Sequence, residues 1–225
     1  MGNVGRRPEP ASDVCSSRRS GDPQRDPRAE RRPDQGRRRY PSATVSSLLD
    51  QLAYWDRSVL EASQELRWAP LTLLFVLASA WWVKGLVFVG VGALGDARER
   101  RLFPPCAACT AAALGLGAAA AGLLKELVDR ARPAIADPAI DALVATPDSP
   151  SFPSGHAATA FAAAAAVGVF YPRLRWPLYG LATLVGLSRI YLGVHFTLDV
   201  VAGAALGVAI GLAAAWLTRR VVRTA

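Results

Sequence analysis

The sequence has few cysteines and histidines, and this limits the chemistry that the chain can carry out. Its 225 residues include three cysteines and two histidines. Three cysteines do not make the even, regularly spaced set of a disulfide-rich secreted domain. Cys106 and Cys109 stand three apart, but a zinc or redox site needs a polar setting and usually more ligands. We interpret them as small apolar residues of a membrane helix.

Charged residues are almost absent from five long stretches of the chain, which is 52% hydrophobic. The stretches are 71–94, broken only by a lysine, and 102–124, 157–171, 176–187 and 200–217. A membrane-spanning helix needs about 20 apolar residues, and the shorter stretches approach this length with their flanking residues. We therefore predict an all-α, polytopic membrane bundle of about five transmembrane helices rather than a large soluble enzyme. Gly203, Gly207 and Gly211 recur every four residues, which predicts close helix packing.

The first 43 residues lack the large apolar side chains that a folded core requires. They are rich in Arg, Pro, Asp and Ser, so they bury too little surface to fold. No apolar stretch follows their charges, which excludes a signal peptide within this segment. We predict a disordered basic tail over 1–43 that either contacts anionic lipid headgroups or stays solvated. Residues 219–225 are expected to form a second basic tail.

Residues 44–68 place apolar and charged side chains on opposite faces of a helix. The apolar stripe consists of Leu48, Leu52, Trp55, Val59, Ala62 and Leu66. The charged face consists of Asp50, Asp56, Arg57, Glu61 and Glu65. This pattern predicts an amphipathic interfacial helix in front of a membrane domain at 69–218. Packing of the stripe against the bundle is the alternative.

Apart from the arginine-rich loop 172–175 and the C-terminal segment, the ionisable residues near the second to fifth spans gather at one end of each. They are Lys125, Glu126, Asp129, Arg130, Arg132, His156, Arg189, His195 and Asp199, with Asp137, Asp141 and Asp148 in the long loop 126–153. In a chain that alternates up and down, these four helix ends lie on the same side of the membrane. Ionisable residues at membrane depth are typical of functional sites, so we predict a single site at this surface.

Three cations in this set predict a site for a multivalent anion such as phosphate. Lys125 and Arg132 stand seven apart, two turns of a helix that Pro133 is expected to end. Arg189 adds a third cation, and an arginine can bind two phosphate oxygens at once.

The two histidines complete a possible reaction centre. His195 and Asp199 stand four apart on one helical face, so the aspartate can accept one ring N–H and leave the other nitrogen as a nucleophile. His156 follows Ser154 and Gly155, a pair suited to a helix N-cap and to close backbone approach by an anion. There it can protonate a leaving oxygen.

These motifs resemble those of the type-2 phosphatidic acid phosphatase superfamily. The matching blocks are Lys125 with Arg132-Pro133, then Pro153-Ser154-Gly155-His156, then Ser188-Arg189 with His195 and Asp199. The resemblance covers about residues 70–218 and implies that His195 forms a phosphohistidine, supported by Asp199, with His156 as the general acid. It implies that the phosphoryl group is held by Lys125, Arg132, Ser154, Gly155 and Arg189, without metal or cofactor. Many relatives have six spans, whereas five and an interfacial helix are predicted here.

We therefore expect an integral membrane lipid phosphatase. Its substrate would be an isoprenoid diphosphate, phosphatidic acid or phosphatidylglycerol phosphate. A lipid phosphotransferase with an alcohol acceptor and a non-catalytic lipid-binding protein are the alternatives, whereas the haloperoxidases of the superfamily are soluble. Expected partners are the lipid phosphate and membrane lipids, with no nucleic acid, and the oligomeric state stays open.

Arginines gather at the helix ends opposite the predicted site. They are Arg98, Arg100, Arg101, Arg173, Arg175, Arg219, Arg220 and Arg223. The positive-inside rule places them in the cytoplasm, and thus the site on the extracytoplasmic face of the cell membrane. Five spans then place the basic N-terminal tail outside as well, which the rule disfavours.

Overall fold

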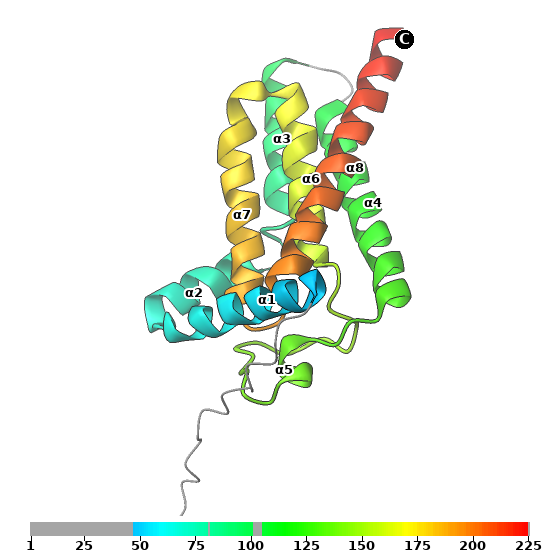
Figure 1. The fold of residues 1–225 in the computed structure, drawn as a ribbon. Helices are drawn as coiled ribbons and strands as arrows, with labels where there is room; N and C mark the ends of the chain where they lie inside the picture. Colours follow the sequence, from blue (N-terminus) through cyan, green and yellow to red (C-terminus); the bar gives the residue numbers. More distant parts are fainter. Residues whose placement is uncertain (1–46, 81, 101–104, 225) are drawn as a thin grey trace, which may run out of the picture. The chain divides into compact units, whose positions relative to one another are not determined.

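The computed structural model describes residues 47–80, 82–100 and 105–224, and the predicted tail 1–43 lies outside them. Every regular element in these residues is helical, which confirms the all-α class. The longer elements are α1 (Leu48–Glu65), α2 (Ala69–Ala78), α3 (Leu86–Arg98), α4 (Pro105–Val128), α6 (Gly155–Phe170), α7 (Arg175–Tyr191) and α8 (Thr197–Thr224). α3, α4, α6, α7 and α8 run roughly alongside one another, whereas α1 and α2 cross one end of them (Figure 1).

Two segments of the described chain, Pro105–Ala136 and Thr197–Val222, are long and apolar enough to cross a membrane. The second continues as a helix to Thr224, so residues 219–224 extend α8 instead of leaving it as a separate tail.

Helix α6 packs tightly against α8 because small residues line their contact. A Cβ atom at Gly203 would lie 2.5 Å from the carbonyl oxygen of Ser154. A Cβ atom at Gly207 or Gly211 would collide with the backbone of α6 as well. The predicted close packing at these glycines is therefore confirmed, and it fixes the start of α6 beside the start of α8.

The first predicted span is wrong as a single helix. Turns at 79–80 and 82–85 divide the stretch 71–94 between α2 and α3. The second turn carries Lys84 to the wall of a polar cavity. A charged side chain is costly among lipid tails and is tolerated where it faces a polar site. Average hydropathy conceals this break because one lysine weighs little among many apolar neighbours.

The second predicted span ends earlier than expected. α4 ends at Val128, and Asp129 follows with φ of 45°, a left-handed conformation that stops the helix. Pro133 begins the short helix α5 (Pro133–Ala136), as proline commonly does, instead of ending α4. The prediction that Lys125 and Arg132 share one helix is therefore wrong, although both reach the same cavity.

Helix α1 turns its apolar stripe away from the other helices. Trp55 and Leu66 are each 66% exposed, whereas Asp56 and Leu60 on the inner side are buried. Asp56, on the predicted charged face, is buried because its carboxylate pairs with Arg130. The stripe does not pack against the bundle, and an exposed apolar face is what an interfacial helix presents to lipid.

Candidate active site

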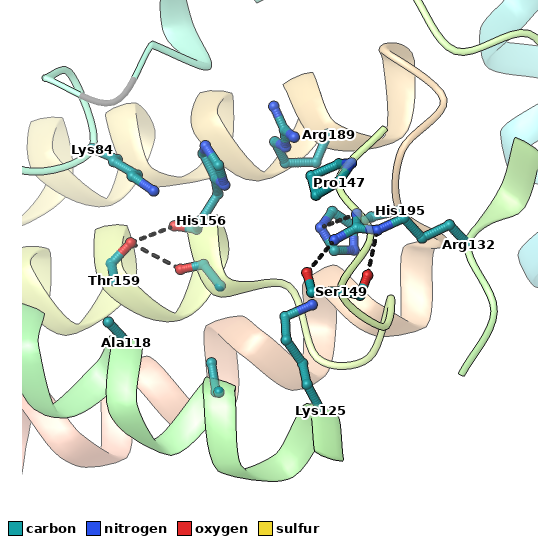
Figure 2. Close-up of a pocket in the computed structure, with 13 residues that line it drawn as sticks. Lys84, Ala118, Lys125, Arg132, Pro147, Ser149, His156, Thr159, Arg189 and His195 are labelled. Carbon is teal, nitrogen blue, oxygen red and sulfur yellow. Dashed lines mark hydrogen bonds between the residues drawn. The ribbon is translucent and has the colours of Figure 1, made fainter. Parts of the chain in front are cut away.

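A cavity of about 230 Å³ lies among the polar helix ends (Figure 2). Six of the eight predicted site residues line it: Lys125, Arg132, Gly155, His156, Arg189 and His195. Lys84 adds a fourth cation to its wall, and none of the described residues that line it is acidic. The cavity is therefore suited to a multivalent anion.

His195 and Asp199 meet at the turn between α7 and α8. The Nδ1 atom of His195 lies 3.5 Å from Oδ2 of Asp199, and the Ser151 hydroxyl lies 3.4 Å from Nδ1 and donates to the same Oδ2. On the other side of the ring, NH1 of Arg132 is 3.3 Å from Nε2. Because a guanidinium only donates, Nε2 must accept, and the ring proton belongs on Nδ1. This tautomer leaves the Nε2 lone pair on the side of the cavity cations.

Burial determines the charge of His195. The residue is 2% exposed. Removal from water lowers the pKa of His195 to about 4, and the nearby carboxylate of Asp199 offsets this only in part. The imidazole is therefore neutral at pH 7, as a nucleophile requires.

The loop before α6 holds two of the cavity cations. Arg132 donates from Nε to the carbonyl of Ser149 at 2.7 Å and from NH1 to the carbonyl of Val194 at 3.0 Å. Lys125 donates from Nζ to the carbonyl of Pro150. These bonds fix a lysine from α4 and an arginine from the following loop on one wall, although the two belong to different elements.

The turn after α2 orients the remaining pair of groups. Arg189 donates to the hydroxyl of Ser79, and the backbone of Ser79 hydrogen-bonds to the ring of His156. The Nε atom of Arg189 is buried without a hydrogen-bond partner in the described chain. An anion in the cavity would supply the acceptor that this donor needs.

Ser154 is the N-cap residue of α6, as predicted, but its hydroxyl does not cap the helix. That hydroxyl is buried and unpaired within the described residues, and its backbone N–H donates to the carbonyl of Asp199 at 2.9 Å. A Cβ atom added to Gly155 would meet nothing within 4 Å, so the first turn is open. Its N–H groups have no carbonyl partner inside the helix, which is the usual basis of anion binding at a helix start.

Several residues at or near the cavity are not predicted from the sequence. Lys84 could have been found, since it is the lone charged residue in an apolar stretch. Nothing in the sequence marks Ser79, Ser149 and Ser151, because serines are common in turns and loops. Arg130 belongs to the recognised cluster of ionisable residues but had no assigned role.

Comparisons with known proteins identify a family and several relatives. The model of the PAP2 superfamily matches residues 106–223. A decaprenylphosphoryl-5-phosphoribose phosphatase of Mycobacterium tuberculosis is 40% identical over 128 residues, which cover 56% of this chain and 67% of that protein. A phosphatidylglycerophosphatase B of Bacillus subtilis is 35% identical over 96 residues, which cover 38% of this chain and 44% of that protein.

Two solved structures share the fold. A transmembrane PAP2 type phosphatidylglycerolphosphate phosphatase from Bacillus subtilis superposes with a TM-score of 0.61 and 25% identity, covering 79% of this chain and 90% of that one. LpxE of Aquifex aeolicus gives a TM-score of 0.59 at 25% identity, covering 70% and 92%.

Proposed function

This chain belongs to the PAP2 superfamily, and from that premise we propose that it removes a terminal phosphate from a membrane lipid through a phosphohistidine at His195. One observation carries the proposal. The Nε2 lone pair of His195 lies beside the cations of an acid-free cavity wall, while Nδ1 faces the carboxylate of Asp199. This is the arrangement of an oriented nucleophile next to a phosphate site.

In the first half of the reaction, Nε2 of His195 attacks the phosphorus atom of the terminal phosphate. The bond from phosphorus to the lipid oxygen breaks, and its electron pair goes to that oxygen. The oxygen takes a proton from His156, whose protonated form the charge of the bound phosphate favours. Asp199 stabilises the positive charge that the imidazole acquires. The phosphoryl oxygens are held by Lys125, Arg132, Arg189, the Ser154 hydroxyl and the first N–H groups of α6.

In the second half, water replaces the lipid alcohol. His156, now neutral, takes a proton from the water while its oxygen attacks the phosphohistidine. The nitrogen–phosphorus bond breaks, its electrons return to Nε2, and inorganic phosphate leaves. An alcohol in place of water would give transfer instead of hydrolysis, and the assay below separates these outcomes.

The substrate we propose is a lipid with charge close to the bond that breaks, such as a polyprenyl diphosphate. Lys84 and Arg189 lie near enough to His156 to interact with it electrostatically, and Lys84 is drawn on the His156 side of the cavity (Figure 2). This is the side of the leaving group. Ala118, Ala121 and Gly122 also line the cavity and offer small apolar groups for the start of the lipid tail.

We also propose a multi-pass protein of the cell membrane whose cavity opens on the extracytoplasmic face. The end of α3, the start of α7 and the end of α8 lie at the end of the bundle opposite the starts of α6 and α8 (Figure 1). The cavity lies near those starts, since Gly155, His156 and His195 line it. The arginines at the first three ends therefore support this orientation by the positive-inside rule. Single cysteines introduced as Glu61→Cys and Arg173→Cys, in a chain otherwise free of cysteine, would test it. An impermeant maleimide should label the first in intact cells and the second only after lysis, and the reverse pattern would overturn the orientation.

The function is tested with purified protein and a panel of lipid monophosphates and diphosphates with different tails. We expect release of inorganic phosphate and no alkyl phosphate when short alcohols are added. Formation of alkyl phosphate would identify a phosphotransferase, and no release from any member of the panel would contradict the proposed function.

A further inference from the structure

Arg130 joins two buried carboxylates behind the cavity. Its NH1 atom lies 2.6 Å from Oδ1 of Asp199, and its NH2 atom lies 2.7 Å from Oδ2 of Asp56. The guanidinium also lies over the ring of Phe196, 4.2 Å from its centre. The carboxylate side chains are 0% and 1% exposed, and Arg130 is 28% exposed. Two carboxylates from distant parts of the chain thus share one arginine.

Asp56 reaches the start of α8 by a second contact. Its Oδ1 atom accepts the backbone N–H of Leu198 at 2.9 Å, which satisfies a first-turn donor of α8. One turn further along α1, Leu60 is fully buried in the same apolar cluster as Val200. Leu198 and Val200 flank Asp199, so α1 contacts the chain on both sides of this carboxylate.

We propose that Asp56 and Arg130 are positioning residues for phosphoryl transfer, which fix the Asp199 carboxylate in the orientation that holds His195. The inference rests on the proposed function of His195. Because Arg130 occupies Oδ1, the Oδ2 atom stays turned toward Ser151 and Nδ1 of His195. Without the arginine, two buried carboxylates would lose the cation that both depend on.

Neither residue lines the cavity, and this separates their role from that of the phosphate-binding cations. Their loss should slow the chemical step and leave substrate binding intact. The same placement connects α1 to the proposed reaction centre. One face of α1 presents the exposed apolar stripe, and another carries Asp56, which helps to orient Asp199.

The test compares kcat and KM of Arg130→Gln and Asp56→Asn with the wild type, on one lipid phosphate in one detergent. We expect kcat to fall roughly 10–100-fold, the range known for groups that orient metal-binding histidines. KM and the inhibition constant of vanadate should stay within about twofold, whereas loss of a phosphate-binding group would change both. The value of kcat is expressed per folded molecule, so that an unfolded fraction does not lower it. The double variant should lose no more than the worse single variant, since both act through Asp199.

Arg57 and Asp137 provide matched controls. They form another ion pair between α1 and the long loop, at 3.6 Å, that does not reach Asp199. Arg57→Gln and Asp137→Asn carry the same chemical changes and should retain wild-type kcat. Arg130→Lys keeps the charge but cannot bridge two carboxylates, so it should recover only part of the lost kcat.

The inference is overturned if Arg130→Gln keeps its kcat, if KM rises while kcat holds, or if the controls lose as much as the test variants. If Arg130→Gln does not fold, the same comparison is made with Arg130→Lys, and a wild-type kcat there overturns the inference. A wild-type protein that forms no phosphoenzyme would instead contradict the proposed function.

Discussion

Asp199 and Asp96 are buried carboxylates at opposite ends of the bundle, and they differ in their partners. Asp96 accepts hydrogen bonds at 3.0 Å from the backbone N–H groups of Cys106 and Ala107 and from the hydroxyl of Tyr171. These are neutral donors, and two of them belong to the first turn of α4. Asp199 meets a guanidinium, a serine hydroxyl, a backbone N–H and the ring of His195.

The difference indicates how a structural acid can be told from a functional one in this fold. A carboxylate at a helix start with neutral donors stabilises that start and leaves nothing to react. A carboxylate that holds a titratable ring beside a cation-lined cavity controls the state of a reactive group. Both positions look alike in the sequence, since each acid stands at the end of an apolar stretch.

The largest effect should come from His195→Ala. Without the Nε2 nucleophile we expect turnover to fall by about 10⁴-fold or more, while the protein remains folded in the membrane. Rapid quench with labelled substrate should trap an acid-labile, base-stable phosphoenzyme in the wild type and none in the variant. A phosphoenzyme that still forms in His195→Ala would disprove the assignment.

Replacing each buried acid by its amide tests the comparison directly. Asp199→Asn should lower kcat about 10³–10⁴-fold, because an amide favours the wrong imidazole tautomer. Asp96→Asn should leave kcat per folded molecule unchanged and cost about 1–3 kcal/mol of stability, because one of its donors loses its acceptor. Turnover and the thermal unfolding midpoint in detergent separate the two outcomes. A large loss of kcat in Asp96→Asn at unchanged stability would break the distinction.

The proposed reacting groups are predictable from the sequence because they lie in short motifs. His156 stands two residues after the N-cap residue Ser154. His195 and Asp199 are four residues apart around the start of α8, so local geometry brings these two near each other. The helix ends are less predictable. Asp129 stops α4 in a left-handed conformation that non-glycine residues seldom adopt, and Lys84 marks a break that average hydropathy conceals.

Ion pairs between residues far apart in the chain cannot be predicted from this sequence. Asp56 and Arg130 are 74 residues apart, and each has the ordinary appearance of a charged residue on a helix face or in a loop. Only the packing of α1 across the bundle end brings them together. A single sequence therefore predicts the residues proposed to react and misses the residues proposed to position them.

His156→Ala should have a smaller effect that depends on the leaving group. An alkyl lipid phosphate releases a poor leaving group, so loss of the general acid should cost roughly 10²–10⁴-fold. A nitrophenyl phosphate releases a stabilised phenolate and should lose far less, with a diphosphate in between. The measurement is kcat/KM on all three substrates. His195→Ala is the control and should lose kcat/KM by a similar factor on each. An equal loss on all three in His156→Ala would mean that His156 binds phosphate or supports structure.

Lys84→Gln should lower kcat/KM by at most about tenfold, equivalent to roughly 1.4 kcal/mol, and the loss should depend on the substrate. The lysine lies on the leaving-group side, so its charge should assist a departing phosphate more than a departing alcohol. We expect kcat/KM to fall about tenfold on a polyprenyl diphosphate and about twofold on the matching monophosphate. Arg175→Gln, at the opposite end of the bundle, should change neither. Equal losses on both substrates in Lys84→Gln would remove the argument for a diphosphate.

The smallest expected effect concerns the protonation of His195, and it sharpens the comparison between the two acids. The chain has two histidines, so His156→Gln leaves a single imidazole to observe by ¹⁵N NMR in a preparation without a histidine tag. Because burial lowers the pKa of His195 to about 4, the ring should stay neutral, with its proton on Nδ1, as the pH falls from 7 to 5. An ordinary histidine, with a pKa near 6.5, would become largely protonated over that range.

Replacing either buried aspartate in this background tests which carboxylate affects the pKa of His195. Asp199 favours the protonated ring, so adding Asp199→Asn should lower the pKa of His195 below 4. Adding Asp96→Asn should leave it near 4, because that carboxylate sits at the other end of the bundle. The lowered pKa also makes the free energy of unfolding depend on pH. Below about pH 6.5 the unfolded chain binds a proton on this ring, and the folded chain does not. Stability should therefore decline from pH 6.5 toward pH 4 by this group alone. Titration of the ring near pH 6.5 would show that His195 is not held in the dry, oriented setting that the proposed nucleophile requires.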